Sequence, residues 1–289
     1  MVVVGEWRDI ARRFARNRLA VACSIVLVVM YAIMLLSYVW VGGKPITMPQ
    51  DPYEYNLLRA MAPPSASHII GTDRIGHDAL SQVIEGSKIS LNIGLASMAA
   101  AILLGVAVGG LAGYYGGWLD GLLMRLTDLF LSFPQLPLLL VLAVLFSPGF
   151  WMLVLFISLF SWMNVARLVR AQFLSLREKE FVLAARAIGA SDWRIMTAHL
   201  LRNSWAPVIV AGTLGIANAI LTEAWLSFLG FGVPPSVPSW GNLLTDAGDY
   251  MFTAPLLVIV PGTAITLTVL CFNFLGDGLR DALDPYLKD

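Results

Sequence analysis

Charge is what this sequence lacks most. Asp, Glu, Lys and Arg make up 13% of its 289 residues, whereas 58% are hydrophobic and the mean hydropathy is +0.75. Soluble domains carry about 25% charged residues, so a soluble fold of this composition could not cover its surface with polar groups. The sequence therefore predicts an integral membrane protein. The formal net charge is zero, which gives no indication of a nucleic-acid partner.

Cysteine and histidine are also scarce. The two cysteines, Cys23 and Cys271, fall inside apolar runs and lack the spacing of metal ligands. We interpret them as small hydrophobic side chains rather than as a disulfide or a metal site. The three histidines, His68, His77 and His199, are spread over both predicted membrane sides, so we expect no metal site in this chain.

Common catalytic signatures are missing as well. The chain has no G-x-x-x-x-G-K-[ST] phosphate-binding loop, no H-E-x-x-H and no G-x-S-x-G. We therefore expect that the chain is not an enzyme and that it holds no cofactor of its own. A membrane enzyme with a regulatory loop is an alternative, but it would need a nucleophile facing a base, and the sequence offers no such pair.

Six apolar stretches are long enough, or nearly so, to cross a bilayer as helices, which takes about 20 residues. The first follows five arginines, is too long for a signal-peptide core and has no cleavage site after it, so we expect an uncleaved helix. Pro134 and Pro137 interrupt the third stretch, and only residues 147–148 separate it from the fourth, which predicts a tight hairpin. The expected fold is an all-α integral membrane protein with six transmembrane helices at 19–41, 91–113, 122–146, 149–166, 206–231 and 255–275.

The distribution of positive charge predicts the orientation of these spans. With six spans, fifteen Lys and Arg residues fall on the side of the two termini and four on the other. By the positive-inside rule, both termini and the loop 167–205 are expected in the cytoplasm. The expected organisation is a cytoplasmic segment 1–18, a first helix 19–41, a Pro-rich extracytoplasmic cap 42–90 and a transmembrane domain 91–289. A second external segment, 232–254, has no Lys or Arg.

Two carboxylates lie inside predicted spans, where ionisable groups are costly. Asp128 is three residues after Arg125, which predicts an ion pair on one helix face. Glu223 is expected either to line a pathway or to bond the neighbouring GFGVPP turn. A self-sufficient proton-coupled carrier that uses Asp128 and Glu223 is therefore an alternative function. The many Gly and Ala residues of 91–113 predict close helix packing, with a subunit interface as one candidate location.

The loop 167–205 is the most polar part of the chain. An Ala-rich run at 182–188 favours a helix, Gly189 ends it, and Ser191 can cap a second helix that begins at Asp192. The small side chains of Ala184, Ala185 and Ala187 would leave a narrow surface that fits a groove on a partner. An amphipathic helix pair that lies on lipid headgroups is the alternative.

The string EFVLAARAIGASDWRIMTAHLLRN resembles the EAA loop of bacterial ABC-importer permeases. In that pattern a Glu-Ala-Ala triplet is followed after three residues by Gly, with Ile and Leu-Pro further on. Here Leu183 replaces the usual Glu and Arg202 replaces the usual Pro. The resemblance implies coupling to an ATPase through six residues: Leu183, Ala184, Ala185, Ala187, Ile188 and Gly189.

Four further blocks resemble the dipeptide, oligopeptide and nickel permeases, and most closely their C-type subunit. They read HIIGTDRIGHDALSQVIEGSKISLNIG, LTDLFLSFPQLPLLL, EAWLSFLGFGVPPSVPSWGNLL and FLGDGLRDALDP. His77 takes the position of an Arg that is usual in the first block. The matching blocks extend from His68 to Pro285.

The resemblance implies a six-helix permease subunit that forms a heterodimer with a homologous permease. Two cytoplasmic ATPase subunits would hold the ATP and Mg, and an extracytoplasmic binding protein would deliver the substrate. The expected location is a bacterial or archaeal cell (inner) membrane. The sequence does not distinguish dipeptides, oligopeptides and nickel chelates as substrates.

Overall fold

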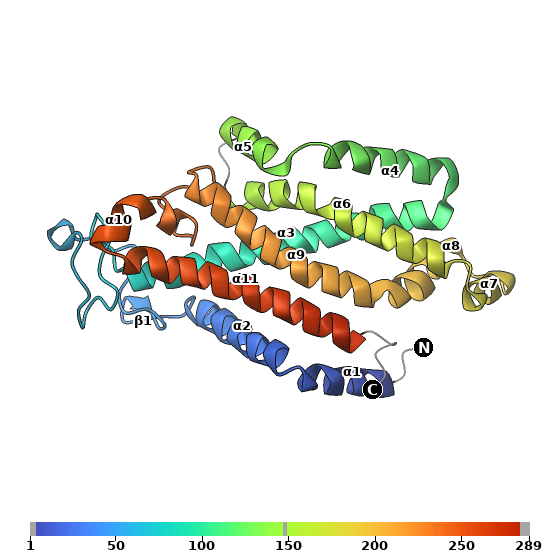
Figure 1. Cartoon of the computed structure of the whole chain (residues 1–289), viewed down its shortest axis with the longest axis horizontal. Helices are drawn as coiled ribbons and strands as arrows, with labels where there is room; N and C mark the ends of the chain where they lie inside the picture. Colours follow the sequence, from blue (N-terminus) through green and yellow to red (C-terminus); the bar gives the residue numbers. More distant parts are fainter. Residues whose placement is uncertain (1–3, 147–148, 284–289) are drawn as a thin grey trace.

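Long helices packed side by side make up most of the structure, a computed structural model that describes residues 4–146 and 149–283 (Figure 1). Five helices are long and apolar enough to span a membrane: α2 (Arg18–Leu36), α3 (Ala79–Tyr115), α6 (Phe150–Leu176), the continuous helix Asp192–Phe228, and α11 (Leu256–Leu283). Helices α4 (Gly117–Leu131) and α5 (Gln135–Phe146) pass the same test only as a pair and meet at an angle of 80°, so the candidate spans in the described part of the chain number five, or six if this bent pair counts as one span. The predicted all-α membrane fold is confirmed, whereas the predicted hairpin at 147–148 lies outside the described residues.

Several helices extend beyond the apolar runs that predicted them. Helix α3 begins at Ala79 because the Asp78 side chain caps it, accepting a hydrogen bond of 2.9 Å from the Ser81 backbone N–H. It is 37 residues long, about 55 Å at ~1.5 Å per residue, against a hydrocarbon thickness of ~30 Å. Its polar end therefore belongs to the external segment that was predicted as a cap.

Both strands and several short helices lie at one end of the bundle (Figure 1). The strands β1 (Trp40–Val41) and β2 (Lys44–Pro45) pair antiparallel, and Gly42 and Gly43 between them both have positive φ, as a two-residue hairpin turn requires. The remaining short elements of this end are η1 (Leu57–Arg59), η3 (Asn242–Leu244) and α10 (Ala247–Thr253). The sequence predicted an ordered cap here but not its strands.

The opposite end holds α1 (Val4–Arg16), the last turns of α11 and the short helix α7 (Glu180–Ala187) (Figure 1). Asn17 separates α1 from α2 and caps α2 through a hydrogen bond of 3.1 Å from the Ala20 backbone N–H. The N-terminal basic segment, the loop 167–205 and the end of α11 therefore share one end of the molecule. The predicted grouping of these segments is confirmed, while the side of the membrane on which they lie stays a prediction.

Helix α3 packs on α6 through three glycines spaced four residues apart. A Cβ atom at Gly105 would lie 2.5 Å from the Val165 Cβ, one at Gly109 would lie 2.2 Å from the Ala166 carbonyl oxygen, and one at Gly113 would lie 2.7 Å from the Phe173 Cβ. Small residues at this spacing allow two helix backbones to approach closely in a membrane. The predicted close helix packing is therefore confirmed for these glycines, which are used inside the chain. A subunit interface, the candidate location, stays a prediction for the other small residues of 91–113.

The replacement Gly109→Ala is expected to lower the free energy of unfolding by about 1–3 kcal/mol, because its methyl group would overlap the α6 backbone. The matched control is Gly262→Ala in α11, where a Cβ would meet nothing within 4 Å and the change stabilises a helix by up to about 1 kcal/mol. The measurement is the midpoint of thermal unfolding in detergent. Equal midpoints for the two variants would contradict this packing.

Candidate functional site

The loop after α6 forms two helices separated at Gly189, as predicted. Helix α7 (Glu180–Ala187) ends in a Schellman motif, in which the Gly189 N–H donates to the Arg186 carbonyl and the Ala190 N–H donates to the Ala185 carbonyl, both at 3.0 Å. Gly189 has φ +82°, a backbone conformation that other residues adopt only with strain. The sharp turn at this position therefore depends on glycine.

Five of the six predicted coupling residues are exposed, and one is not. Leu183 is 48% exposed and Ile188 is 86% exposed, and Ala184, Ala187 and Gly189 are also exposed. Ala185 is only 6% exposed, because together with Val182 it forms the face of α7 that packs on the rest of the chain. The free surface of α7 and its C-cap is thus formed around Leu183, Ala184 and Ile188, and of the two motif alanines only Ala184 contributes to it.

The second helix of the loop continues into the membrane without a break. Ser191 caps α8 (Asp192–Arg194), accepting from the Arg194 N–H at 3.4 Å, and a π-helical turn, η2 (Ile195–Leu201), connects α8 to α9 (Arg202–Phe228). The Tyr114 hydroxyl at the end of α3 donates a hydrogen bond of 2.6 Å to Asp192. A displacement of this end of the loop is therefore transmitted directly to α9.

Asp128 pairs with Arg167 of α6, so the predicted pair with Arg125 is wrong. A second pair joins the same two helices, with the Arg170 guanidinium donating to Asp120 of α4 at 2.6 Å. Helix α6 extends ten residues beyond its predicted end, so both arginines, three residues apart, belong to this helix. Both ion pairs join α4 to its neighbour α6. The linear sequence does not reveal that these two helices are close together.

Glu223 is fully buried, and its carboxyl group accepts hydrogen bonds from the hydroxyls of Ser90 at 2.9 Å and Ser227 at 2.7 Å. The predicted bond to the GFGVPP turn, residues 230–235, is therefore wrong. The Ser90 hydroxyl also accepts from the backbone N–H of Trp240 at 3.2 Å, and the Trp240 indole donates to the Val83 carbonyl at 2.9 Å. The carboxyl group thus connects α3, α9 and the external loop, and it is not exposed to a pathway.

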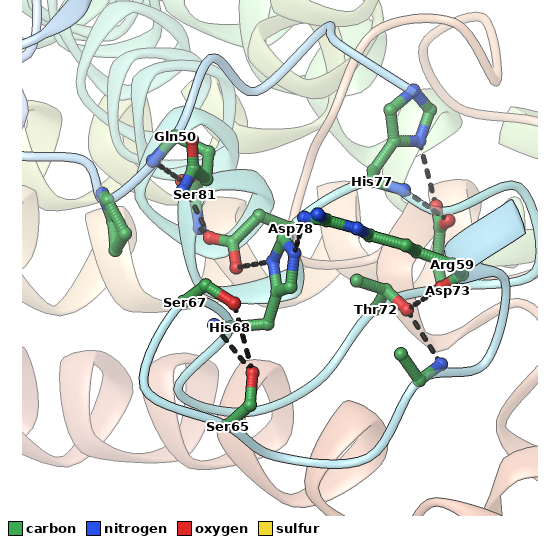
Figure 2. Close-up of polar contacts among 12 residues, drawn as sticks. Gln50, Arg59, Ser65, Ser67, His68, Thr72, Asp73, His77, Asp78 and Ser81 are labelled. Carbon is green, nitrogen blue, oxygen red and sulfur yellow. Dashed lines mark hydrogen bonds and ion pairs between the residues drawn. The ribbon is translucent and has the colours of Figure 1, made fainter. Parts of the chain in front are cut away.

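The block GTDRIGHD, residues 71–78, takes part in a compact network of polar contacts in the cap (Figure 2). His68 and Asp78 are joined by a hydrogen bond of 3.0 Å between the imidazole Nδ1 and a carboxyl oxygen, and both side chains are buried. His77, which stands where the family usually has Arg, pairs with Asp73 at 2.8 Å. Neither pair was predicted from the sequence. His68 and Asp78 are ten residues apart and meet only because the loop between them folds back.

Two further contacts connect the cap to the membrane helices and to the second external loop. The Tyr53 hydroxyl donates to the Glu85 carboxyl group at 3.1 Å, and burial raises the pKa of Tyr53 to about 12, so that this phenol stays protonated. Arg74 bonds Asp249 and lies 3.5 Å from Asp246, beside α10. The two external segments therefore form one surface.

Metal-binding clusters of three or more His, Cys, Asp or Glu side chains are absent from residues 4–146 and 149–283. Cys23 and Cys271 are both buried with free thiols, in one hydrophobic cluster between α2 and α11. Both cysteines thus pack as small hydrophobic side chains.

These features define a class, a polytopic helical membrane protein with a helical loop at one end and a folded cap at the other. Comparison with known proteins identifies the family. Residues 101–289 match the model of the binding-protein-dependent transport system inner membrane component, and residues 5–64 match that of the N-terminal TM domain of oligopeptide transport permease C.

Three relatives are similar over nearly the whole chain. The dipeptide transport system permease protein DppC of Alkalihalophilus pseudofirmus is 37% identical over 99% of this chain and 91% of its own length. The glutathione transport system permease protein GsiD of Pectobacterium atrosepticum is 39% identical, with 98% and 92% covered. The oligopeptide transport system permease protein OppC of Bacillus subtilis is 36% identical, with 98% and 90% covered.

The chain belongs to the family of binding-protein-dependent transport system inner membrane components. It is a multi-pass permease subunit of an ABC importer, and it is not an enzyme, since ATP hydrolysis in these systems lies in partner subunits. The resemblance found in the sequence is thereby confirmed.

Replacing Glu223 distinguishes a structural carboxyl group from one that acts in transport. Glu223→Gln is expected to lower the free energy of unfolding by about 1–3 kcal/mol, because one of two buried serine hydroxyls loses its acceptor. The midpoint of thermal unfolding measures this effect, and Glu178→Gln at an exposed position is the control. Uptake per assembled complex is expected to stay unchanged; a loss of uptake with an unchanged midpoint would instead assign Glu223 to the pathway.

Proposed function

We propose that this subunit forms half of the translocation pathway of an importer for short peptides, paired with a homologous permease. The three relatives are named for the transport of dipeptides, glutathione and oligopeptides, which share a short peptide backbone. Nickel chelates, which the sequence alone left open, appear in none of these names. The match to a C-type N-terminal domain over residues 5–64 supports a heterodimer with a second, different permease.

The coupling of this pathway to ATP is assigned to the free face of α7. The observation that carries this assignment is the exposure of apolar side chains on α7 and at its C-cap, above all Ile188 at 86%. An exposed apolar side chain on a short helix at the polar end of a membrane protein fits a groove on a soluble partner. We take this partner to be one of two ATPase subunits, which hold the ATP and Mg themselves. Two of the motif residues on α7, Leu183 and Ala184, are exposed as well.

The way in which α7 is attached explains how its movement would change the pathway. Val182 packs in the same core cluster as Ile195 and Leu200 of η2, and η2 continues into α9. A pull on α7 by closing ATPase subunits would therefore displace α9 as a rigid element. The positive charge at this end supports a cytoplasmic position for both termini and the loop. The cap at the other end would then face the extracytoplasmic binding protein.

The rival function, a carrier that is driven by a proton gradient, would need carboxyl groups that can exchange protons with a pathway. Glu223 is fully buried with two hydroxyl partners, and Asp128 is paired with Arg167. Neither arrangement favours a proton relay. Peptide uptake that depends on ATP and on the binding protein, measured in proteoliposomes with the complete complex, tests the proposed function directly. Uptake by this chain alone under a pH gradient would favour the rival.

Ile188→Asp is expected to reduce ATPase co-purification and ATP-driven uptake at least about tenfold, because it places a charge in an apolar contact. The measurements are the ratio of ATPase to permease after affinity purification and the rate of uptake. The matched control Ile188→Leu keeps an apolar side chain of the same size and is expected to behave as the unchanged protein.

The fold of this chain is expected to tolerate Ile188→Asp, because the side chain contacts mainly solvent in the isolated subunit. An unchanged midpoint of thermal unfolding confirms this point. Normal ATPase binding and normal uptake by Ile188→Asp would rule out the free face of α7 as the coupling surface.

A further inference from the structure

A cavity of about 440 Å³ opens on the face that α5, α6 and α9 share. Its volume is in the range of small-molecule sites, about 300–1,000 Å³. Five lining residues carry neutral amides or hydroxyls: Gln135, Ser161, Asn164, Asn218 and Thr222. Among residues 4–146 and 149–283, those that line it include no Asp, Glu, Lys, Arg or His. The cavity is therefore polar without being charged.

The polar groups follow helix periodicity along the two long helices. Ser161 and Asn164 are three residues apart on α6, and Asn218 and Thr222 are four residues apart on α9, so each pair lies on one face of its helix. Asn164 lies near the midpoint of Phe150–Leu176, and Asn218 is close to the midpoint of Arg202–Phe228. Asn164 is one turn before Arg167, so the cavity extends from the middle of the predicted span 206–231, where Asn218 lies, toward the charged end of α6.

The amides of Gln135, Asn164 and Asn218 are exposed, and within the described part of the chain none of them makes a side-chain hydrogen bond. An amide that faces hydrocarbon without a partner costs several kcal/mol on the scale of about 4–8 for transfer to an alkane. Such groups in a membrane face water, a ligand or another protein surface. This face of the subunit is therefore not a lipid-contacting face.

The break between α4 and α5 gives independent evidence that this place does not face lipid. Residues 132–134 between the two helices are exposed and are not helical, and Gln135 directly after them lines the cavity. Irregular backbone at membrane depth is tolerated only where protein buries it or where it lines a water-filled cavity. Residues 132–134 are exposed in this subunit, so in the proposed heterodimer they meet water or the second permease rather than lipid.

A second cavity, of about 330 Å³, shares Ala211 and Leu214 with the first and extends along α9 to Arg280 of α11. Arg280 is in the last turn of α11, and this end of α11 lies at the end of the bundle that holds α7 (Figure 1). The two cavities are therefore neighbours along α9, the helix that also carries the coupling loop.

We infer that the cavity between α5, α6 and α9 is a peptide-conducting subsite that binds the peptide backbone through the neutral amides of Asn164, Asn218 and Gln135. This inference rests on the proposed peptide import and adds its recognition chemistry. The amides donate to and accept from peptide groups of any sequence. Because no lining charge holds a terminus or a charged side chain, the subsite does not select by charge and does not trap the peptide. Conduction requires binding of this kind, favourable enough to enter and weak enough to leave.

The experiment compares variants in the complete complex, reconstituted in proteoliposomes with the binding protein and ATP. Uptake is measured for trialanine, alanyl-glutamyl-alanine and alanyl-lysyl-alanine. The double variant Asn164→Leu with Asn218→Leu removes both amides at similar volume. We expect uptake of all three peptides to fall about tenfold and in the same proportion, as the loss of two hydrogen bonds predicts. The KM for the peptide-loaded binding protein is expected to stay unchanged.

Asn218→Asp introduces a charge at nearly constant shape. It is expected to lower uptake of the glutamyl peptide at least about fivefold relative to the lysyl peptide. Thr222→Val and Thr266→Val form a matched pair, because both hydroxyls donate to the carbonyl four residues before at 2.8 Å, while only Thr222 lines the cavity. Only Thr222→Val is expected to reduce uptake.

The inference is overturned if the assembled double variant imports normally, if its loss differs among the three peptides, or if Asn218→Asp does not discriminate between the charged peptides. A loss of pairing with the second permease, at unchanged uptake per assembled complex, would assign the amides to the subunit interface instead. If the double variant does not assemble, Asn218→Asp and the threonine pair carry the test. Failure of the unchanged complex to import any of the peptides would contradict the proposed function itself, whereas normal import with insensitive variants contradicts the subsite alone.

Discussion

The close approach of α3 to α6 is the contact on which the rest of the structure depends. Lipid supplies no hydrophobic drive between helices, so contact area and polar pairs must hold them together. Gly105, Gly109 and Gly113 bring the α6 backbone to a distance that a methyl group would prevent. With α6 in this position, its arginines reach the carboxylates of α4, and α9 packs against both helices. The cavity-lining helices α6 and α9 are thus fixed relative to α3, which contributes only Met98 to the lining.

Polar groups in this subunit are used differently at different depths. Near the two ends of the bundle, charges are paired, as Arg170 is with Asp120 and Arg74 with Asp249. Between the cap and the middle, the carboxyl group of Glu223 is buried and bonded by two hydroxyls. Near the middle, neutral amides remain exposed on one face. Only the last group is available to something that passes through, which agrees with the cost of charge in hydrocarbon.

The sequence predicted what depends on local composition and failed where distant helices meet. Apolar length predicted the spans, and the Ala-rich run with Gly189 and Ser191 predicted both helices of the loop. The partner of Asp128 could not be predicted, because Arg167 is thirty-nine residues away and its proximity follows from the α3–α6 packing. The inward position of Ala185 depends on which face of α7 meets η2. A signal for the cavity was present in Asn164 and Asn218, since both amides lie inside predicted spans, and polar side chains are unusual in helices that face lipid.

The π-helical turn η2 determines the angular phase between the two ends of one helix. In an α-helix each residue turns the side-chain direction by about 100°, whereas a π-helical turn winds more residues into each revolution. The direction in which α8 leaves the loop and the direction in which Asn218 faces the cavity are therefore related through Ile195–Leu201. The number of residues between Gly189 and Asn218 therefore determines the angle between the start of α8 and the cavity-lining face of α9, in addition to the distance between them. It keeps the helix end that receives mechanical work and the face that meets the solute in a fixed rotational relation.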